Sequence, residues 1–306
     1  MANPNWIGVD WGTSNLRVWG MSRDSTVLAQ VNTDQGMNGL HAEDFEPILL
    51  NNIEEWLPGS GPVPVIVCGM AGAKGGWETA PYRAAPCLPL SAEESVAPRT
   101  ADRRLAVRIL PGISQTRPAH DVMRGEETQI AGFLSVNPGF DGIVCLPGTH
   151  TKWVHLSAGE IVSFRTFMTG ELFGLLQRYS VLREILDRSN WDEAEFASSV
   201  ETQISRPEAL AARIFTARAE SLISDLEPAK ATGRLSGALI GAELAAARTY
   251  WLGRDVVLIG QARLVDAYAR ALAVVGQNPR PENAERMTIL GLTAAFAMFR
   301  AKEFRP

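Results

Sequence analysis

Apolar and polar positions alternate over short stretches near the start of the chain and follow a helical period farther along it. Residues 5–10, 16–21 and 26–33 are short apolar runs separated by polar turns, and we expect three strands there. A continuous apolar run over 63–70, bounded by Pro and Gly, is typical of a strand buried on both faces. The opening of the chain is therefore predicted as a sheet.

The rest of the chain mixes strands with helices. Further strands are expected over 105–112 and 254–260, and a strand, turn and strand over 141–156. Helical periodicity predicts helices at 41–57, 125–136, 169–188, 191–203, 207–226, 236–251, 263–276 and 285–299. This order predicts an α/β fold.

One long-range repeat stands out. The segments "IGVDWGTSNLRVW" (7–19) and "GIVCLPGTHTKWV" (142–154) each contain an apolar strand, a Gly-Thr turn and a second strand. A chain of 306 residues is long enough for two domains. We expect domains at 1–138 and 139–306, with a cleft between them in which the two turns bind a nucleotide's phosphates from both sides.

The first turn is rich in hydrogen-bond donors. Gly12 permits close backbone approach, and Thr13, Ser14 and Asn15 supply hydroxyl, amide and N–H groups. The same residues are common in hairpin turns without any ligand, so this segment alone leaves both interpretations open. The second turn favours the phosphate site.

Two charged residues flank that first turn. Asp10 would repel phosphate oxygens, so its expected role is to hold Mg²⁺ directly or through water. Arg17 is expected to contact a phosphate or a substrate carboxylate.

The second turn has a glycine, two hydroxyls and a cation: Gly148, Thr149, His150, Thr151 and Lys152. A lysine can meet phosphates as a point charge. For His150 a structural hydrogen bond in the turn is favoured over direct chemistry, and Lys152 has the alternative of being solvated on an alternating strand.

Phosphoryl transfer to an alcohol needs a base near the acceptor. The segment "DVMRGEETQIAG" offers Asp121, Glu126 and Glu127, with Gly125 allowing the chain to turn into a helix. Acidic residues in a first helical turn also suit the helix dipole, and that structural explanation is strong for Glu127.

A Gly-rich loop, "GMAGAKGGWETAPY" (69–82), follows the buried strand at 63–70, where ligand loops of α/β sheets occur. Lys74 is expected to neutralise a substrate carboxylate, and Trp77 and Tyr82 to wall a small pocket. A flexible surface loop remains the alternative. It is not a P-loop, because no Gly-Lys-Ser/Thr follows the glycines.

Glycines also mark the second half. Gly260 ends a strand where an adenine ring could lie against the backbone. Gly237 and Gly241 give a helix a smooth face, for which close helix packing is the favoured interpretation.

Composition narrows the function classes. The chain is 46% hydrophobic and 21% charged, with a net charge of −5, so it offers no broad basic field for nucleic acid or an anionic membrane. Its start has no signal-like pattern. Cys68, Cys87 and Cys145 show no metal-binding spacing, and we expect reduced core cysteines in a cytoplasmic protein.

These motifs, together with "FRTFMTGELFGLL" (164–176), resemble in order those of the 2-keto-3-deoxygalactonate kinase family, within the acetate and sugar kinase, chaperone and actin superfamily. The resemblance covers nearly the whole chain. It implies two ribonuclease-H-like domains that close on ATP and Mg²⁺, and transfer of the γ-phosphate to the 6-hydroxyl of 2-keto-3-deoxygalactonate in galactonate catabolism.

The resemblance also assigns roles. Larger sugar kinases of the superfamily carry a Gly-Asp-Gln segment with the catalytic base, and "GEE" occupies that place here, so Glu126 is the expected base and Asp121 the second choice. Arg165 is expected to face the cleft and contact substrate. The expected partner is a small sugar acid, with a homodimer as a further expectation.

Two other functions fit the same motifs. Exopolyphosphatases of the superfamily carry a "GEE"-like segment, which makes a phosphohydrolase the enzyme alternative. A non-catalytic sugar- or nucleotide-binding regulator of the same fold is the third interpretation.

Overall fold

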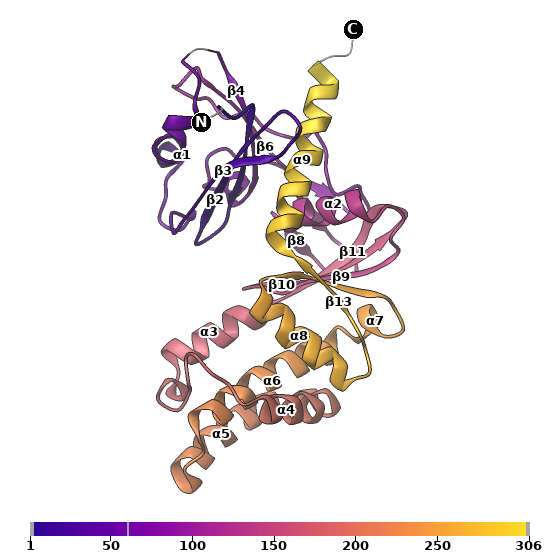
Figure 1. Cartoon of the computed structure of the whole chain (residues 1–306). Helices are drawn as coiled ribbons and strands as arrows, with labels where there is room; N and C mark the ends of the chain where they lie inside the picture. Colours follow the sequence, from indigo (N-terminus) through magenta and orange to yellow (C-terminus); the bar gives the residue numbers. More distant parts are fainter. Residues whose placement is uncertain (1–2, 60, 304–306) are drawn as a thin grey trace. The chain divides into compact units, whose positions relative to one another are not determined.

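The fold is described by a computed structural model, which covers residues 3–59 and 61–303. Its internal contacts group the chain into two units. Unit 1 comprises the residues up to Phe140, Ser157–Ser163 and the segment from Ala284 onward, and unit 2 comprises Asp141–Leu156 and Phe164–Asn283. Figure 1 shows unit 1 mainly in indigo and purple and unit 2 mainly in pink and orange.

Unit 1 is built on a five-stranded sheet in the order β3-β2-β1-β4-β6. Strands β1, β2 and β3 are antiparallel neighbours, whereas β4 and β6 run parallel to β1. A three-stranded sheet, β5-β7-β8, lies in the same unit. The elements of this unit are β1 (Trp6–Trp11), β2 (Leu16–Met21), β3 (Val27–Thr33), α1 (Phe45–Ile53), β4 (Val63–Gly69), β5 (Tyr82–Ala84), β6 (Leu105–Ile109), β7 (Gly112–Gln115), β8 (Asp121–Met123), α2 (Glu126–Val136) and α9 (Ala284–Glu303).

Unit 2 repeats that arrangement with a five-stranded sheet in the order β11-β10-β9-β12-β13. Strand β10 is antiparallel to β9, and β12 and β13 are parallel to it. Helices make up the rest of the unit. Its elements are β9 (Gly142–Leu146), β10 (Thr151–Ser157), β11 (Glu160–Phe167), α3 (Thr169–Tyr179), α4 (Glu193–Ser205), α5 (Leu210–Ser224), α6 (Pro228–Ala246), α7 (Arg248–Trp251), β12 (Val256–Gly260), α8 (Ala262–Val274) and β13 (Arg280–Asn283).

The shared strand order confirms the predicted fold class of two ribonuclease-H-like domains. In each sheet the central strand, β1 or β9, is fully buried and leads through a Gly-Thr turn into an antiparallel neighbour. The repeat seen in the sequence is therefore a repeat in structure, and each turn begins where a buried strand ends.

The helices of unit 2 pack closely through glycines, as expected for Gly237 and Gly241. A Cβ on Gly237 would lie 2.4 Å from the Phe196 carbonyl oxygen, and one on Gly241 would lie 2.9 Å from that of Val200. Because side chains at these positions would separate the two helices, α4 and α6 depend on both glycines for their contact.

The C-terminal helix differs from the predicted domain division. We expected it in the second domain, but α9 packs on α2, β1 and β4 of unit 1 (Figure 1). The crossing is a contact of backbones: a Cβ on Gly132 would lie 1.9 Å from the Met287 oxygen, and one on Gly291 would lie 1.9 Å from the Thr128 oxygen. The apolar face of α9 adds Leu292 to the core of unit 1.

Some element boundaries also differ from expectation. The helix expected over 169–188 ends at Tyr179, where Ser180 takes an extended backbone and its hydroxyl accepts a hydrogen bond from the Leu182 N–H, starting a 3-10 turn. Strands β5, β7, β8, β11 and β13 were not expected. The shortest have three or four residues, and β13 reads "RPEN", which carries no apolar pattern.

Two expectations from composition can be compared with the structure. All three cysteines are buried and free, as predicted. Among the described residues, no helix combines the length and the apolar character needed to cross a bilayer.

The α2–α9 crossing yields a stability prediction. Gly291→Ala should lower the free energy of unfolding by about 2 kcal/mol or more, because its methyl group has no room beside the Thr128 carbonyl. Gly174→Ala on α3 is the matched control: nothing lies within 4 Å of that Cβ position, so it should be neutral or slightly stabilising. Thermal and urea melts measure both, and equal stabilities for the two variants would contradict the packing described here.

Candidate functional site

The first turn of unit 1 is a tight loop with its polar side chains exposed. The Gly12 N–H donates to the Asn15 carbonyl oxygen at 2.8 Å, and Thr13, Ser14 and Asn15 all lie at the surface. The following segment braces the loop from behind: the Met37 N–H donates to Gly12 at 3.0 Å. The donors expected to meet phosphates are thus held on a fixed backbone.

Gly36 was missed by the sequence analysis. A Cβ at this position would lie 2.3 Å from the carbonyl carbon of Ser14, so only glycine lets the bracing segment lie against the turn. The residue is three positions after a strand, in a polar stretch, and the sequence gives no sign of this distant contact.

Asp10 is the last but one residue of β1, and its carboxylate is buried, with the residue 9% exposed. It forms an ion pair with Arg17, which sits opposite it on the neighbouring strand. Gly69 lies on its other side, where a Cβ would come within 3.3 Å of Asp10 Oδ1 and 2.5 Å of the Trp11 carbonyl oxygen. Gly69 has φ +85°, a conformation that favours glycine, and a side chain here would collide with the Trp11 backbone.

The start of α2 reaches the same place. Gly125, with φ +107°, would place a Cβ only 3.4 Å from the Gly69 Cα. The next residue is Glu126, whose Oε2 accepts a hydrogen bond from the Arg124 N–H at 3.0 Å. The Asp10 carboxylate and the backbone segment that carries Glu126 therefore both lie beside Gly69 in unit 1.

Glu127 has a structural role. Its side chain is 1% exposed, and its two carboxylate oxygens accept hydrogen bonds from the Gly125 N–H at 2.7 Å and the Thr128 hydroxyl at 3.2 Å. Burial, together with the negative charge of Glu126, raises the pKa of Glu127 to about 7. The structural explanation favoured for this residue is confirmed by these contacts at the helix start.

Asp121, the second choice for the base, lies on β8 and not on α2. Its Oδ1 accepts a hydrogen bond from the adjacent Val122 N–H at 2.8 Å. The backbone at Gly125 turns between the two acidic residues, so Asp121 and Glu126 start from different elements.

The three residues of the Gly-rich loop that were expected to contact substrate lie in different environments. Lys74 is exposed, as a residue meeting a ligand needs to be. Trp77 differs from expectation: it is 7% exposed and packs in the core with Trp11 and Phe45, so its ring anchors the loop. Tyr82 is 43% exposed, and the Arg124 guanidinium lies 4.3 Å from its ring centroid.

In unit 2 the second turn lies against the start of α3. The backbone of Gly148 and Thr149 lies very close to the start of this helix: a Cβ on Gly170 would lie 2.2 Å from the Gly148 carbonyl oxygen. The Glu171 N–H donates to the Thr149 carbonyl oxygen at 2.9 Å. A helix N-terminus beside a polar turn is a site that favours anions.

His150 has the structural hydrogen bond that was favoured for it. Its Nε2 lies 2.5 Å from Glu171 Oε2, which ties the tip of the turn to the first turn of α3. Both side chains are partly exposed.

Thr151 and Lys152 are less accessible than expected. Thr151 is fully buried, and its hydroxyl lies 2.8 Å from the Tyr268 hydroxyl. The Thr151 hydroxyl, which was expected to face phosphate, is therefore hydrogen-bonded within the unit. Lys152 is only 5% exposed, so the alternative of a solvated lysine is wrong. Adjacent residues of a strand point to opposite faces of the sheet, and both faces of β10 are covered here, so both residues are buried.

A buried carboxylate explains how this part of unit 2 is held. Glu243 on α6 is 3% exposed and accepts hydrogen bonds from Trp153 Nε1 at 2.8 Å, from the Tyr268 hydroxyl at 2.7 Å and from the Thr169 hydroxyl. Burial raises its pKa to about 7 in spite of these donors. Sequence analysis assigned no role to Glu243, because its partners come from three other elements.

A cavity of about 340 Å³ opens beside the second turn, within unit 2. Gly148, Thr149 and Gly170 form one end, and side chains of α6 and α8 form the walls. Trp191 and Arg263 are among its lining residues. Gly260, expected at an adenine, is not among them, and its Cβ position lies 3.1 Å from Val265.

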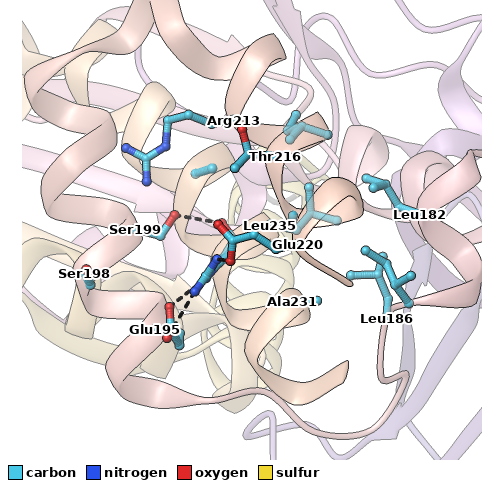
Figure 2. A pocket seen from close by; sticks show the side chains of 15 residues that line it. Leu182, Leu186, Glu195, Ser198, Ser199, Arg213, Thr216, Glu220, Ala231 and Leu235 are labelled. Carbon is cyan, nitrogen blue, oxygen red and sulfur yellow. Dashed lines mark hydrogen bonds and ion pairs between the residues drawn. The ribbon is translucent and has the colours of Figure 1, made fainter. Parts of the chain in front are cut away.

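A second cavity of about 340 Å³ lies among α4, α5 and α6 and contains none of the predicted site residues (Figure 2). Glu195 and Glu220 on its wall both pair with Arg234, so the charges there compensate one another. Arg165, expected to contact substrate, lies exposed on β11 in unit 2.

The donor set suits magnesium better than a metal that needs a closed cage. In the described part of the chain, no three His, Cys, Asp or Glu side chains form a metal-binding group. Mg²⁺ typically takes one or two carboxylates and completes its shell with water and phosphate oxygens, so the single carboxylate of Asp10 fits it.

The raised pKa of Glu127 yields a prediction about pH. The folded protein keeps a proton on this carboxyl between about 4.5 and 7, whereas the unfolded chain releases it near 4.5. The unfolded state then binds fewer protons, so this residue makes the free energy of unfolding fall as pH rises through that window, by on the order of 2 kcal/mol.

Glu127→Gln should therefore reduce the fall in the free energy of unfolding that urea melts measure between pH 4.5 and 8, leaving the fall due to Glu243, whose pKa is also raised to about 7. Glu78→Gln, at an exposed site of the same unit, is the control. A slope identical to wild type in Glu127→Gln would contradict the assignment.

Comparison with known proteins identifies the family of this chain. A relative from Rhizobium meliloti, named as a candidate 2-dehydro-3-deoxygalactonokinase, is 36% identical over 95% of this chain and 96% of its own length. A crystal structure of a candidate 2-dehydro-3-deoxygalactonokinase from Sinorhizobium meliloti matches with a TM-score of 0.88 and 35% identity, covering 96% of this chain and 99% of that one.

A more distant structure shares only the fold. The activator of 2-hydroxyisocaproyl-CoA dehydratase from Clostridium difficile, solved with bound ADPNP, has a TM-score of 0.51 at 12% identity, covering 97% of this chain and 96% of that one. The model of the 2-keto-3-deoxy-galactonokinase family matches residues 10–295, from the Asp10 carboxylate to the helix that packs on α2, and the chain belongs to that family.

Proposed function

We propose that this protein transfers the γ-phosphate of ATP to the 6-hydroxyl of 2-keto-3-deoxygalactonate, as a kinase of galactonate catabolism. The observation that carries the proposal is the meeting of Asp10, Gly69, Gly125 and Glu126 in unit 1, in a chain of the 2-keto-3-deoxy-galactonokinase family. A carboxylate that can hold a metal and a second carboxylate that can act as a base are what phosphoryl transfer to an alcohol requires.

The nucleotide is assigned to unit 2. The 340 Å³ cavity ends at Gly148 and Thr149, and the N-terminus of α3 adds its positive dipole there. We assign the base and ribose to the cavity walls and the phosphates to the turn. Lys152 and Thr151 support the turn from within, since both are buried.

Asp10 is the residue proposed to hold Mg²⁺, which would neutralise charge on the phosphates. Arg17 pairs with that carboxylate, so it keeps the carboxylate oriented. The exposed donors of Thr13, Ser14 and Asn15 are proposed to contact phosphate oxygens of the nucleotide.

Glu126 acts on the acceptor. It orients the 6-hydroxyl and takes its proton while the hydroxyl oxygen forms a bond to the γ-phosphorus and the bond to the bridging oxygen of ADP breaks. Glu127 is not suited to this role, because it is buried and its oxygens already accept two hydrogen bonds.

An acceptor survey tests the function. ADP release from ATP and Mg²⁺ should depend on 2-keto-3-deoxygalactonate and be at least tenfold slower with simple neutral sugars. A reaction without acceptor is the control. Rapid phosphate release in that control would indicate a phosphohydrolase, and nucleotide binding without any turnover would indicate a regulator.

The base is tested by a pair of variants. Glu126→Gln should lower kcat by about 10²- to 10⁴-fold and leave ATP affinity unchanged, because the amide keeps the shape of the side chain but cannot take a proton. Asp121→Asn should retain most of the activity. Turnover near wild type in Glu126→Gln, with loss in Asp121→Asn, would move the assignment to Asp121.

A further inference from the structure

Arg124 is the residue before Gly125, and the function described above does not use its side chain. Its guanidinium extends away from α2 toward the Gly-rich loop, where Nη2 donates to the Ala80 carbonyl oxygen at 2.8 Å. Nη1 lies beside Gly72, at which a Cβ would come within 2.8 Å of it. The guanidinium is therefore held at a fixed place under the loop.

Most of its donors are unused. Within residues 3–59 and 61–303, neither Nε nor Nη1 of Arg124 has a hydrogen-bond partner, although both atoms are buried. A guanidinium carries five N–H donors and remains charged, so burying two of its nitrogens without an acceptor costs free energy. An anionic ligand that accepts from these donors would remove that cost.

The Tyr82 side chain covers the Arg124 guanidinium. Its ring lies against the guanidinium with a separation of 4.3 Å between Cζ and the ring centroid, and 43% of the tyrosine is exposed. A side chain on the surface can rotate away without disturbing the core, so a ligand could reach Arg124 once the ring is displaced.

The same residue is coupled to the proposed base. The Arg124 N–H donates to Glu126 Oε2 at 3.0 Å, so the cation and the carboxylate are carried by one rigid segment at the start of α2. A sugar acid has its carboxylate at one end and its 6-hydroxyl at the other. Binding the first at the guanidinium would place the second within the reach of Glu126.

We propose that Arg124 binds the carboxylate of the acceptor and thereby selects sugar acids over neutral sugars. The inference rests on the proposed kinase function and adds a specificity-determining residue to it. It also replaces Lys74 as the main cationic contact, because Lys74 lies exposed on the loop while Arg124 is fixed beside the base.

The test compares 2-keto-3-deoxygalactonate with its neutral methyl ester. Wild type should prefer the acid in kcat/KM by about 10- to 100-fold, the range expected for hydrogen bonds to a charged group. Arg124→Gln should bring the ratio close to one by losing activity on the acid alone, and Arg124→Lys should restore part of the preference. Arg103→Gln, an exposed site of unit 1, is the control for loss of one positive charge.

A purely structural role would lower activity on both acceptors equally and leave the ratio unchanged, which would overturn the proposal. Collapse of the ratio in Lys74→Met would also overturn it, and that variant changes only an exposed side chain, so it remains informative if Arg124→Gln does not fold. Calorimetric binding of acid and ester without nucleotide repeats the comparison. If neither the wild type nor any variant turns over the acid, the kinase proposal fails. The ratio of the affinities for acid and ester then still decides the role of Arg124.

Discussion

Close contact between two glycines is the constraint on which the candidate site depends. Gly69 ends β4 and Gly125 precedes α2, and both adopt positive φ values. A Cβ on Gly125 would lie 3.4 Å from the Gly69 Cα, so the end of the strand and the start of the helix are in contact beside Asp10. A methyl group on Gly69 would meet the Trp11 carbonyl oxygen, so β1 and β4 could not keep their spacing at this point.

The chemistry assigned to unit 1 follows from that approach. Glu126, Glu127 and Arg124 leave the same short segment and have different partners. The Glu126 carboxylate accepts from the Arg124 backbone N–H, the buried Glu127 carboxylate accepts from the Gly125 N–H, and the Arg124 guanidinium donates to the Gly-rich loop. Their environments separate their roles. Burial raises the pKa of Glu127, because ionising a carboxyl that is shielded from water costs free energy.

Unit 2 supports its polar turn in another way. Here a buried carboxylate, Glu243, collects hydrogen bonds from three elements and thus fixes β10, α3 and α8 relative to α6. Two domains with one strand order have therefore reached stable turns by different means. Unit 1 relies on glycines alone, and unit 2 combines the close contact at Gly170 with a polar network whose members satisfy one another.

The sequence by itself determined the two strand–turn–strand segments, the buried strands and the order of the motifs, because these depend on residues that are close together in the chain. The tertiary structure decided which of the motif's side chains remain available. Trp77 and Thr151 are residue types that commonly contact ligands, yet both are packed against residues from distant parts of the chain. Only the folded chain brought α9 back to unit 1 and gave Glu243 its three donors, since those contacts join residues that are far apart in the sequence and leave no local pattern.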